Sequence, residues 1–450
     1  PPALRFAVFP YIYRAYQEPS GRFQCAADVL ICVSSLVICY LLLGIFDAIK
    51  LSSLTIGMDS VFQDLFISQH CGTVFSMVGF ERYKRRVAKV RQIMRRSKVD
   101  AMLMSNPISV RYCSGFTGED SFLLLSKRSV ILLTDGRFAE QARIETQGVK
   151  IIIRSERMLA AIAKALERRK IRRVGIEADN LTVAFRDQLE SVAKSVRIKP
   201  LAGVISELRQ IKDDEEISAI RASIRVAEGA FQAMISKGAK GFIGKTEQQI
   251  AAELEYLMRQ GGAERTAFDT IVARGAHAAL PHYRPGRIGG KGSQAKIRHG
   301  DAVLIDWGAV VRGYCSDLTR VVFIGKIPPR IARVYEIVLS AQRAAMEAIR
   351  DGVSARFVDA AARDVISKAG YAKAFTHGLG HGIGLEIHEL PHLGRGIEHK
   401  LTEGMVITIE PGIYLPRMGG VRIEDDYVVC KDGAKRLTTL TRDAEEMILV

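Results

Sequence analysis

Between residues 80 and 205, short apolar runs alternate with stretches whose apolar residues recur at helical spacing. The runs that have the length of a strand are Val99–Met104, Phe122–Leu125, Val130–Leu133, Val149–Ile153 and Val174–Ile176. The helical patterns cover Glu81–Ser97, Met158–Arg169 and Val183–Ser195. This alternation predicts a compact α/β domain over residues 80–205.

Residues 206–450 begin with two helical patterns that are followed by strands. Each helix starts at a capping-box pattern, Asp213 with Glu216 in the first and Thr246 with Gln249 in the second. These caps predict two long helices that pack together ahead of a sheet.

The same order of elements then repeats. A third helix is predicted over Ile331–Arg350, and Ser354 begins a fourth, with Phe357, Ala361 and Val365 on its inward face. Two successive helix–helix–sheet units predict an α+β domain with a pseudo-twofold repeat. We expect its two halves to face each other across a central cleft.

The strand-rich segment Ala302–Ile324 predicts an antiparallel hairpin that turns at Val311–Gly313. Asp306 lies in its first arm and Asp317 in its second, so the two carboxylates face each other or lie diagonally on one face. Two acids in an apolar sheet either point into water at a sheet edge or hold a cation. Because buried charges need partners, we favour the cation.

Three histidines lie in the glycine-rich run Phe375–Leu390. The glycines disfavour a helix and allow close backbone approach, so His377, His381 and His388 are candidates for a functional loop.

The sequence His388–His392 also matches H-E-x-x-H, which places two metal ligands on one face of a helix. Pro391 opposes that helix, because it removes a backbone donor and clashes with the preceding turn. We therefore exclude a helical zinc site here.

Two further β-rich runs, Met405–Tyr414 and Gly420–Val429, carry Glu410 and Glu424 at their centres. Residues 416–420 join the runs as a hairpin, and Arg422 shares a strand face with Glu424. The candidate ligands are then Asp306, Asp317, His381, Glu410 and Glu424. Their four carboxylates would balance two divalent cations, and oxygen-rich ligation with one imidazole favours Mn, with Co or Zn as alternatives.

Charge and cysteine content narrow the class of protein. The net charge is +16, but the basic residues fall mostly on the polar face of a predicted helix, and no nucleic-acid motif accompanies them. After residue 80 only Cys113, Cys315 and Cys430 remain, which is typical of a reducing compartment. We therefore expect a cytoplasmic protein that binds no nucleic acid.

Residues 1–79 share no pattern with the rest of the chain. Val29–Phe46 is free of charge and just long enough to span a membrane, and the arginines before it would keep the N-terminus cytoplasmic. The alternative is upstream translation that the folded protein does not need, with Met77 as the natural start. We favour the second reading and expect residues before Met77 to be dispensable for catalysis.

Four motifs resemble the metal-dependent pita-bread peptidases, in the branch of Xaa-Pro aminopeptidases and prolidases. They are the D-x10-D pair, HGLGHGIGLEIHE, IEPGIY and VRIEDD. Residues Ser105–Ala142 resemble the creatinase-like N-terminal domain of the same enzymes. The resemblance implies that Asp306 binds one metal and that Asp317 and Glu424 bridge both, while His381 and Glu410 complete the second site.

The resemblance also implies catalytic roles for His282, His388 and Glu410. His377 resembles a residue that lines the site for the proline side of the bond, and Arg422 is expected to bind substrate or to orient a neighbouring carboxylate. The segment between His282 and Asp306 looks longer than is usual in these enzymes, which is a departure from the family pattern at the rim of the cleft beside His282.

The implied activity is removal of the residue before a penultimate proline, by a hydroxide that bridges two metals. The alternatives are a prolidase restricted to Xaa-Pro dipeptides and a silent pita-bread binding protein, although the latter should lack some ligands. The resemblance implies peptide substrates with proline at position two and a homodimer or larger homo-oligomer. The large N-terminal domain argues against a methionine aminopeptidase.

Overall fold

The structure is a computed structural model that describes residues 81–286 and 295–450. The expectations for residues 1–79, which include the candidate span Val29–Phe46 and the start at Met77, lie outside the described residues. The glycines at 289–292, in the long segment after His282, lie outside them as well. Within the described ranges, no helix combines the length and the apolar character needed to cross a membrane.

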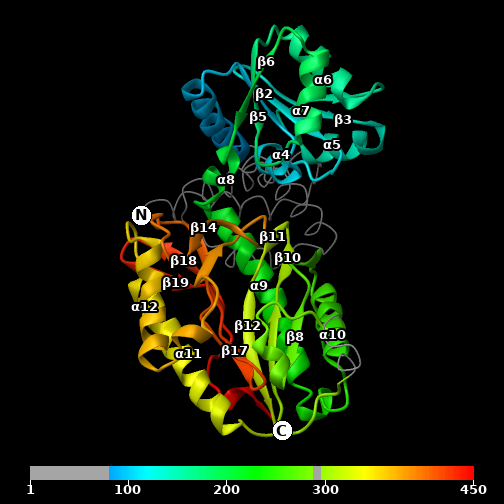
Figure 1. Ribbon diagram of the computed structural model, residues 1–450. Coiled ribbons are helices and arrows are strands. Elements are labelled where there is room, and N and C mark those ends of the chain that lie inside the picture. Colours follow the sequence, from blue (N-terminus) through cyan, green and yellow to red (C-terminus); the bar gives the residue numbers. More distant parts are fainter. Residues whose placement is uncertain (1–80, 287–294) are drawn as a thin grey trace, which may run out of the picture. The chain divides into compact units, whose positions relative to one another are not determined.

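The α/β domain begins with a helix over residues 81–96 and contains a six-stranded mixed sheet in the order β4-β3-β2-β1-β5-β6 (Figure 1). Its strands are β1 (Ala101–Met104), β2 (Phe122–Ser126), β3 (Val130–Thr134), β4 (Lys150–Ile153), β5 (Arg173–Glu177) and β6 (Arg197–Leu201). Its other helices are α4 (Pro107–Ser114), α5 (Ala139–Glu145), α6 (Met158–Arg168), α7 (Val183–Val192) and α8 (Val204–Arg209). The five predicted strands are confirmed within two residues.

Four elements of this domain escaped the sequence prediction: α4, α5, α8 and β6. α4 is short, and it begins where the Asn106 side chain accepts a hydrogen bond from the Ile108 amide. β6 has the sequence RIKPL, whose charges and proline fit only an edge strand. The helix predicted over Val183–Ser195 ends three residues early, as α7, so its predicted end was wrong.

The second domain places α9 (Asp214–Ile235) and α10 (Glu247–Gln260) on one side of its strands and α11 (Pro329–Ala348) and α12 (Ala355–Lys368) on the other (Figure 1). One half of the strands is β7 (Arg265–Thr266), β8 (Ile271–Arg274), β9 (Ala302–Trp307), β10 (Ala309–Val311), β11 (Tyr314–Cys315), β12 (Leu318–Ile324) and β20 (Ile448–Leu449). The other half is β13 (Gly380–Gly382), β14 (Glu389–Leu393), β15 (Val406–Ile409), β16 (Gly412–Leu415), β17 (Gly419–Arg422), β18 (Asp425–Cys430) and β19 (Gly433–Arg436). This order confirms the repeated helix–helix–sheet unit.

Both predicted capping boxes are present. The Glu216 amide donates to Asp213 at 2.9 Å and the Gln249 amide donates to Thr246 at 3.2 Å, with the reciprocal side-chain bonds also formed. Such caps satisfy amides at helix starts that have no partner within the helix, so they fix where α9 and α10 begin.

The inward face predicted for α12 was wrong. Phe357 is 54% exposed, while Val358, Ala362 and Ile366 are buried. The buried stripe is therefore rotated by one residue from the predicted one. Ser354 does cap the helix, through a hydrogen bond from the Phe357 amide.

Two predicted strands, Met405–Tyr414 and Gly420–Val429, are interrupted in the structure. Glu410 and Glu424 each lie in a break, between β15 and β16 and between β17 and β18. Each break releases a carboxylate from the regular alternation of a strand, so the interruptions coincide with the acids proposed for chemistry.

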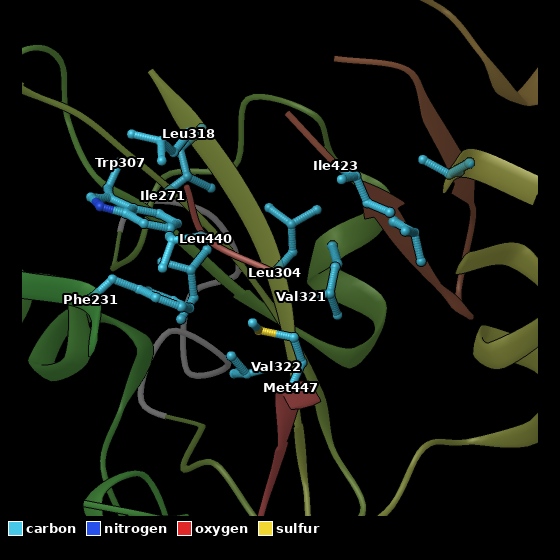
Figure 2. Close-up of a cluster of buried hydrophobic side chains, with 14 of the residues drawn as sticks. Phe231, Ile271, Leu304, Trp307, Leu318, Val321, Val322, Ile423, Leu440 and Met447 are labelled. Atoms are coloured by element: carbon cyan, nitrogen blue, oxygen red, sulfur yellow. The ribbon is translucent and has the colours of Figure 1, made fainter. Parts of the chain in front are cut away.

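The hydrophobic core of the second domain includes residues of the β9–β12 ladder and of α9 that pack together (Figure 2). Trp307 is fully buried and stacks on Phe231 with ring centroids 4.4 Å apart, and its indole N–H donates to the Ala227 carbonyl at 3.0 Å. Trp307 is the last residue of β9 and directly follows Asp306, so core packing also positions that acid.

Replacing Trp307 with alanine should lower the free energy of unfolding by about 3–5 kcal/mol, because it leaves a large cavity in the core. Urea unfolding at constant pH measures this loss. Phe357→Ala is the matched control, because an aromatic side chain that is half in solvent should change stability far less. Equal losses in the two variants would contradict the packing described here.

Candidate metal centre

The predicted hairpin places its two acids diagonally. Asp306 on β9 is the register partner of Thr319 on β12, and Asp317 precedes Thr319 by two residues. The turn at the tip has positive φ at Arg312 and Gly313, 50° and 75°. The hairpin and the proximity of Asp306 and Asp317 are thus confirmed.

Glu424 joins the hairpin through Thr319. The two residues form an isolated β-bridge, and the Thr319 hydroxyl donates to a Glu424 carboxylate oxygen at 2.6 Å. Thr319 itself was not singled out from the sequence. A threonine in an apolar strand carries no signal of its own until the chain returns, more than a hundred residues later, to use it.

His381 lies on β13, where its neighbours must be glycine. A Cβ on Gly380 would stand 2.0 Å from the Thr408 carbonyl oxygen, so β13 approaches β15 more closely than any side chain allows. The His381 Nδ1–H donates to the Gly382 carbonyl at 3.0 Å. This bond leaves Nε2 as the free ligand atom, 3.6 Å from Asp317 and 3.5 Å from Glu410.

Ligand atoms of Asp317, His381 and Glu424 all lie within 4.8 Å of one another, and all three residues are buried. Glu410 adjoins them through His381. One oxygen of Asp306 is paired with Arg422, whereas its Oδ1 is buried without a hydrogen-bond partner among the described residues. Divalent cations bind clustered carboxylate oxygens, and a buried carboxylate oxygen needs a partner. The unpaired oxygen of Asp306 beside the other acids meets both conditions, so these residues fit a metal.

Burial and mutual repulsion perturb every titratable group of this cluster. The pKa of Glu424 is raised to about 8, first by burial and then by the charge of Asp306. Burial and the charge of Glu424 raise the pKa values of Asp317 and Glu410 well above their usual range. Burial lowers the pKa of His381 to about 3. Without bound cations, these carboxyl groups would keep their protons to a higher pH than usual. The cluster is therefore suited to bind cations.

These shifts predict an unusual pH dependence for the metal-free protein. A carboxyl whose folded pKa is raised stabilises the fold at low pH, and this stability is lost as pH rises through the folded pKa. The histidines oppose this only below about pH 6.5. Between pH 6.5 and 8, stability should fall by about 1.4 kcal/mol per pH unit for each carboxyl that stays protonated in the folded state.

Urea unfolding of chelator-treated protein across this window measures the slope. Added divalent metal should flatten it, and Glu424→Gln should reduce it, because the amide cannot titrate. A stability that rises between pH 6.5 and 8 in the metal-free protein would contradict the prediction.

Arg422 lies on the wall of the cleft and is almost fully buried. It pairs with Asp306, donates to the Thr319 hydroxyl at 3.0 Å and donates to the Tyr414 hydroxyl at 2.9 Å. Its ion-pair partner is therefore Asp306, a neighbouring carboxylate of the cluster, and not Glu424. Its guanidinium fixes the orientation of Asp306 and of Tyr414 together.

The Tyr414 hydroxyl also orients the ring of His377. The Nδ1–H of His377 donates to the Gly378 carbonyl at 2.7 Å, so Nε2 accepts from the Tyr414 hydroxyl at 2.8 Å. Burial lowers the pKa of His377 to about 4, with the charge of Arg422 as the second cause. His377 is therefore a neutral, oriented imidazole on the cleft wall.

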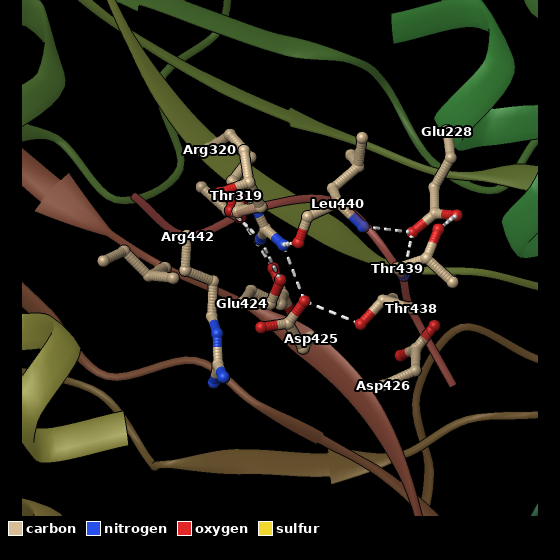
Figure 3. A network of polar contacts seen from close by, with 12 residues as sticks. Glu228, Thr319, Arg320, Glu424, Asp425, Asp426, Thr438, Thr439, Leu440 and Arg442 are labelled. Carbon is tan, nitrogen blue, oxygen red and sulfur yellow. Dashed lines mark hydrogen bonds and ion pairs between the residues drawn. The ribbon is translucent and has the colours of Figure 1, made fainter. Parts of the chain in front are cut away.

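A buried arginine, Arg320, contacts the backbone on both sides of the Thr319–Glu424 pair (Figure 3). Arg320 is fully buried, pairs with Asp425 at 2.7 Å and donates to the Glu424 carbonyl at 2.7 Å. It also donates to the Thr319 and Leu440 carbonyls at 2.9 and 3.1 Å. Because one guanidinium ties these backbones together, the Thr319–Glu424 contact is held rigidly.

The cluster forms the floor of a cleft of about 710 Å³. All five candidate ligands line it, as do His282, His377, His388 and Arg422. His388 is exposed to the cleft, and its ring lies 4.4 Å from that of His381. β14 begins directly after His388, which confirms that the H-E-x-x-H match is not helical.

The cleft contains polar residues that the sequence analysis missed. Asp269, Arg284, His392 and Arg395 line it, and all four are exposed. His392 is the register partner of His381 across β13 and β14. Its place in H-E-x-x-H was a usable signal, because it lies close in sequence to His388, which also lines the cleft. The other three stand in loops without a pattern.

The residue after His388 anchors that wall of the cleft. Glu389 is buried and pairs with Arg209 and, at 3.2 Å, with Lys212, both of which lie in the segment that leads from α8 to α9. Arg209 also pairs with Glu386 at 2.7 Å. Breaking such a buried network would leave uncompensated charges, so it holds the start of β14 in place.

The comparisons with known proteins agree with this geometry. Residues 218–431 match the model of metallopeptidase family M24, and residues 86–211 match the creatinase/prolidase N-terminal domain. An Xaa-Pro dipeptidase of Pyrococcus horikoshii is 39% identical over 359 residues, covering 80% of this chain and 98% of the relative.

Two solved structures are similar over most of their length. The Xaa-Pro dipeptidase from Bacillus anthracis has a TM-score of 0.77 at 35% identity, covering 82% of this chain and all of that one. The X-Pro aminopeptidase from Thermotoga maritima has a TM-score of 0.72 at 36% identity, covering 78% and 97%.

The chain has an α/β domain followed in the sequence by a repeated helix–helix–sheet domain that holds buried carboxylates and one imidazole. These features define a metal-dependent peptidase of the pita-bread class. The chain belongs to metallopeptidase family M24, in the branch with a creatinase/prolidase N-terminal domain. This confirms the resemblance and the fold expected from the sequence. The family implies divalent metal ions as cofactors.

Proposed function

We propose that this protein is a metal-dependent exopeptidase that hydrolyses the bond between an N-terminal residue and a following proline. The observation that carries the proposal is the buried cluster of Asp317, His381 and Glu424, with the unpaired oxygen of Asp306 beside it. Relatives named for Xaa-Pro substrates support the choice of bond.

The proposed ligands are the five residues expected from the sequence. Asp306 would bind one cation, Asp317 and Glu424 would bridge both, and His381 and Glu410 would complete the second. The donor set of carboxylates and one imidazole favours Mn, with Co or Zn as alternatives. When bound, the two cations would supply an activated water, as a hydroxide between them, and would polarise the scissile carbonyl.

The proposed proton carriers surround this floor. Glu410 would accept the proton of the attacking water, since its carboxylate lines the cleft beside the ligand atom of His381. His388 would donate to the developing oxyanion from the cleft wall. His282 would help to protonate the leaving imino nitrogen, and its position in the cleft supports this role.

His377 and Arg422 would act on the substrate side of the site. His377 would line the proline side of the bond as a neutral imidazole held by Tyr414. Arg422 would act as a positioning residue through Asp306, because its donors are engaged by protein groups.

Two substrate lengths remain as candidate specificities. A preference for dipeptides is favoured by the dipeptidase names of several similar proteins. Cleavage of longer peptides, as by an aminopeptidase, is favoured by a similar structure with that name and by the open groove described below. We propose a cleft that accepts both.

We propose an extension over 1–79, an N-terminal domain over 80–205 and a catalytic domain over 206–450. Assembly as a homodimer or larger homo-oligomer is proposed from the resemblance alone. The free thiols of Cys113, Cys315 and Cys430 support a reducing compartment such as the cytoplasm.

Peptide hydrolysis by the purified protein tests the proposal. With added Mn, Ala-Pro and Ala-Pro-Ala should be cleaved and Ala-Ala should not, and exhaustive chelation should abolish activity until metal is restored. Full activity in metal-free protein, or cleavage of Ala-Ala as fast as Ala-Pro, would overturn it.

A further inference from the structure

A second hollow of about 680 Å³ adjoins the metal cleft. Both hollows are lined by His377, Gly378 and Arg395, so they meet along that edge. The second is completed by residues that follow α12, including Lys373 and Phe375, and by Arg363. We call this second hollow the side groove.

The side groove is positively charged. Its lining includes Arg363, Lys373 and Arg395 but no Asp or Glu among the residues the structure describes. Arg363 is neutralised from behind by Asp359, whose oxygen accepts from its Nε at 2.6 Å. Lys373 and Arg395 are exposed and make no ion pair or hydrogen bond within the described part of the chain. Their charges are available to a ligand.

Charge also sets the direction in which a peptide can lie. The free α-ammonium group of an exopeptidase substrate is repelled by the side groove and attracted by Asp269, which stands exposed in the cleft without an ion pair among the described residues. The carboxyl-terminal part of the substrate then points towards His377 and the side groove.

We propose that the side groove binds the residue that follows proline, and that Lys373 selects for a carboxylate there. The carboxylate can be the end of a tripeptide or an acidic side chain of a longer one. This inference rests on the proposed function and deepens it, because it makes tripeptides with a negative third residue the preferred long substrates.

Four peptides separate the sources of the carboxylate: Ala-Pro-Ala, its C-terminal amide, Ala-Pro-Asp-amide and Ala-Pro-Lys-amide. The free acid and the Asp amide should have higher kcat/KM than the two others, mainly through KM. The difference should shrink in 1 M salt, because exposed charges are screened.

Lys373→Gln should lower the ratio of kcat/KM for Ala-Pro-Asp-amide to that for Ala-Pro-Lys-amide by about threefold, and Lys373→Glu by about tenfold. Lys240→Glu makes the same charge change at an exposed lysine on the turn between α9 and α10, and should leave the ratio unaltered. A ratio that changes in the Lys373 variants but not in Lys240→Glu supports the side groove as a subsite.

The outcomes separate this inference from the proposed function. If Ala-Pro is cleaved but tripeptides are not, or if the Lys373 and Lys240 variants have equal ratios, the side groove is not a subsite and the Xaa-Pro activity stands. If no proline peptide is cleaved, both the proposed function and the subsite are overturned.

Discussion

Replacing His381 with alanine is expected to strip metal from the protein and to lower turnover by roughly 10³-fold or more, since bound metals supply several kcal/mol of transition-state stabilisation. The physical reason is the fixed orientation of its ring. With Nδ1 held by the Gly382 carbonyl, Nε2 is free to bind a cation beside Asp317 and Glu410.

Metal analysis of the purified variant measures the loss, and activity measured with added Mn tests whether it can be reversed. His392→Ala is the matched control, because His392 opposes His381 in the strand register but is not among the proposed ligands. We expect that control to keep its full metal content. A His381→Ala protein with two metals per chain would remove His381 from the ligand set.

Replacing His388 with alanine should have a different signature. As a donor to the developing oxyanion, His388 is worth roughly 10²–10³ in turnover. Its loss should lower kcat and kcat/KM together, with KM nearly unchanged, because the interaction exists only in the transition state. Metal content should stay near that of the unaltered protein, since His388 lies beside the ligand His381 without being one.

Steady-state kinetics together with metal analysis separate the two histidines. If His388→Ala retains near-normal turnover, its imidazole only packs in the cleft. If it loses metal as His381→Ala does, His388 is a ligand, and the oxyanion role is wrong.

The candidate ligands could be found from the sequence because each stands out locally. Asp306 and Asp317 interrupt apolar strand patterns, and Glu410 and Glu424 do the same within two later runs. A charge in such a run is costly to bury, so it marks chemistry even when the partners are unknown. The hairpin register then brought the first two together as expected.

The residues that organise the ligands could not be found in this way. Thr319 and Tyr414 read as ordinary members of β-rich runs, and their roles arise only from contacts with Glu424 and with His377. Those contacts join segments far apart in the chain. Local patterns record propensity and burial, whereas such partners are set by tertiary packing.

The helical prediction failed for a related reason. At α12 the cap at Ser354 was right, but a one-residue rotation placed Phe357 in solvent. The apolar stripe of a helix is about 100° wide, which is also the rotation produced by a shift of one residue. Which face of α12 is buried is decided by its packing against α11.

The ion network of Glu389 has a consequence for domain exchange. Arg209 and Lys212 lie in the segment that enters α9, yet their charges are compensated by Glu389, beside His388. A chimera with a foreign N-terminal domain should therefore be joined before α8, at Val204, so that both cations stay with their acid. A junction after Lys212 would replace both cations with foreign residues and leave Glu389 as a buried anion without a partner. The start of β14 in the cleft wall would then be destabilised by a change made far away in the sequence.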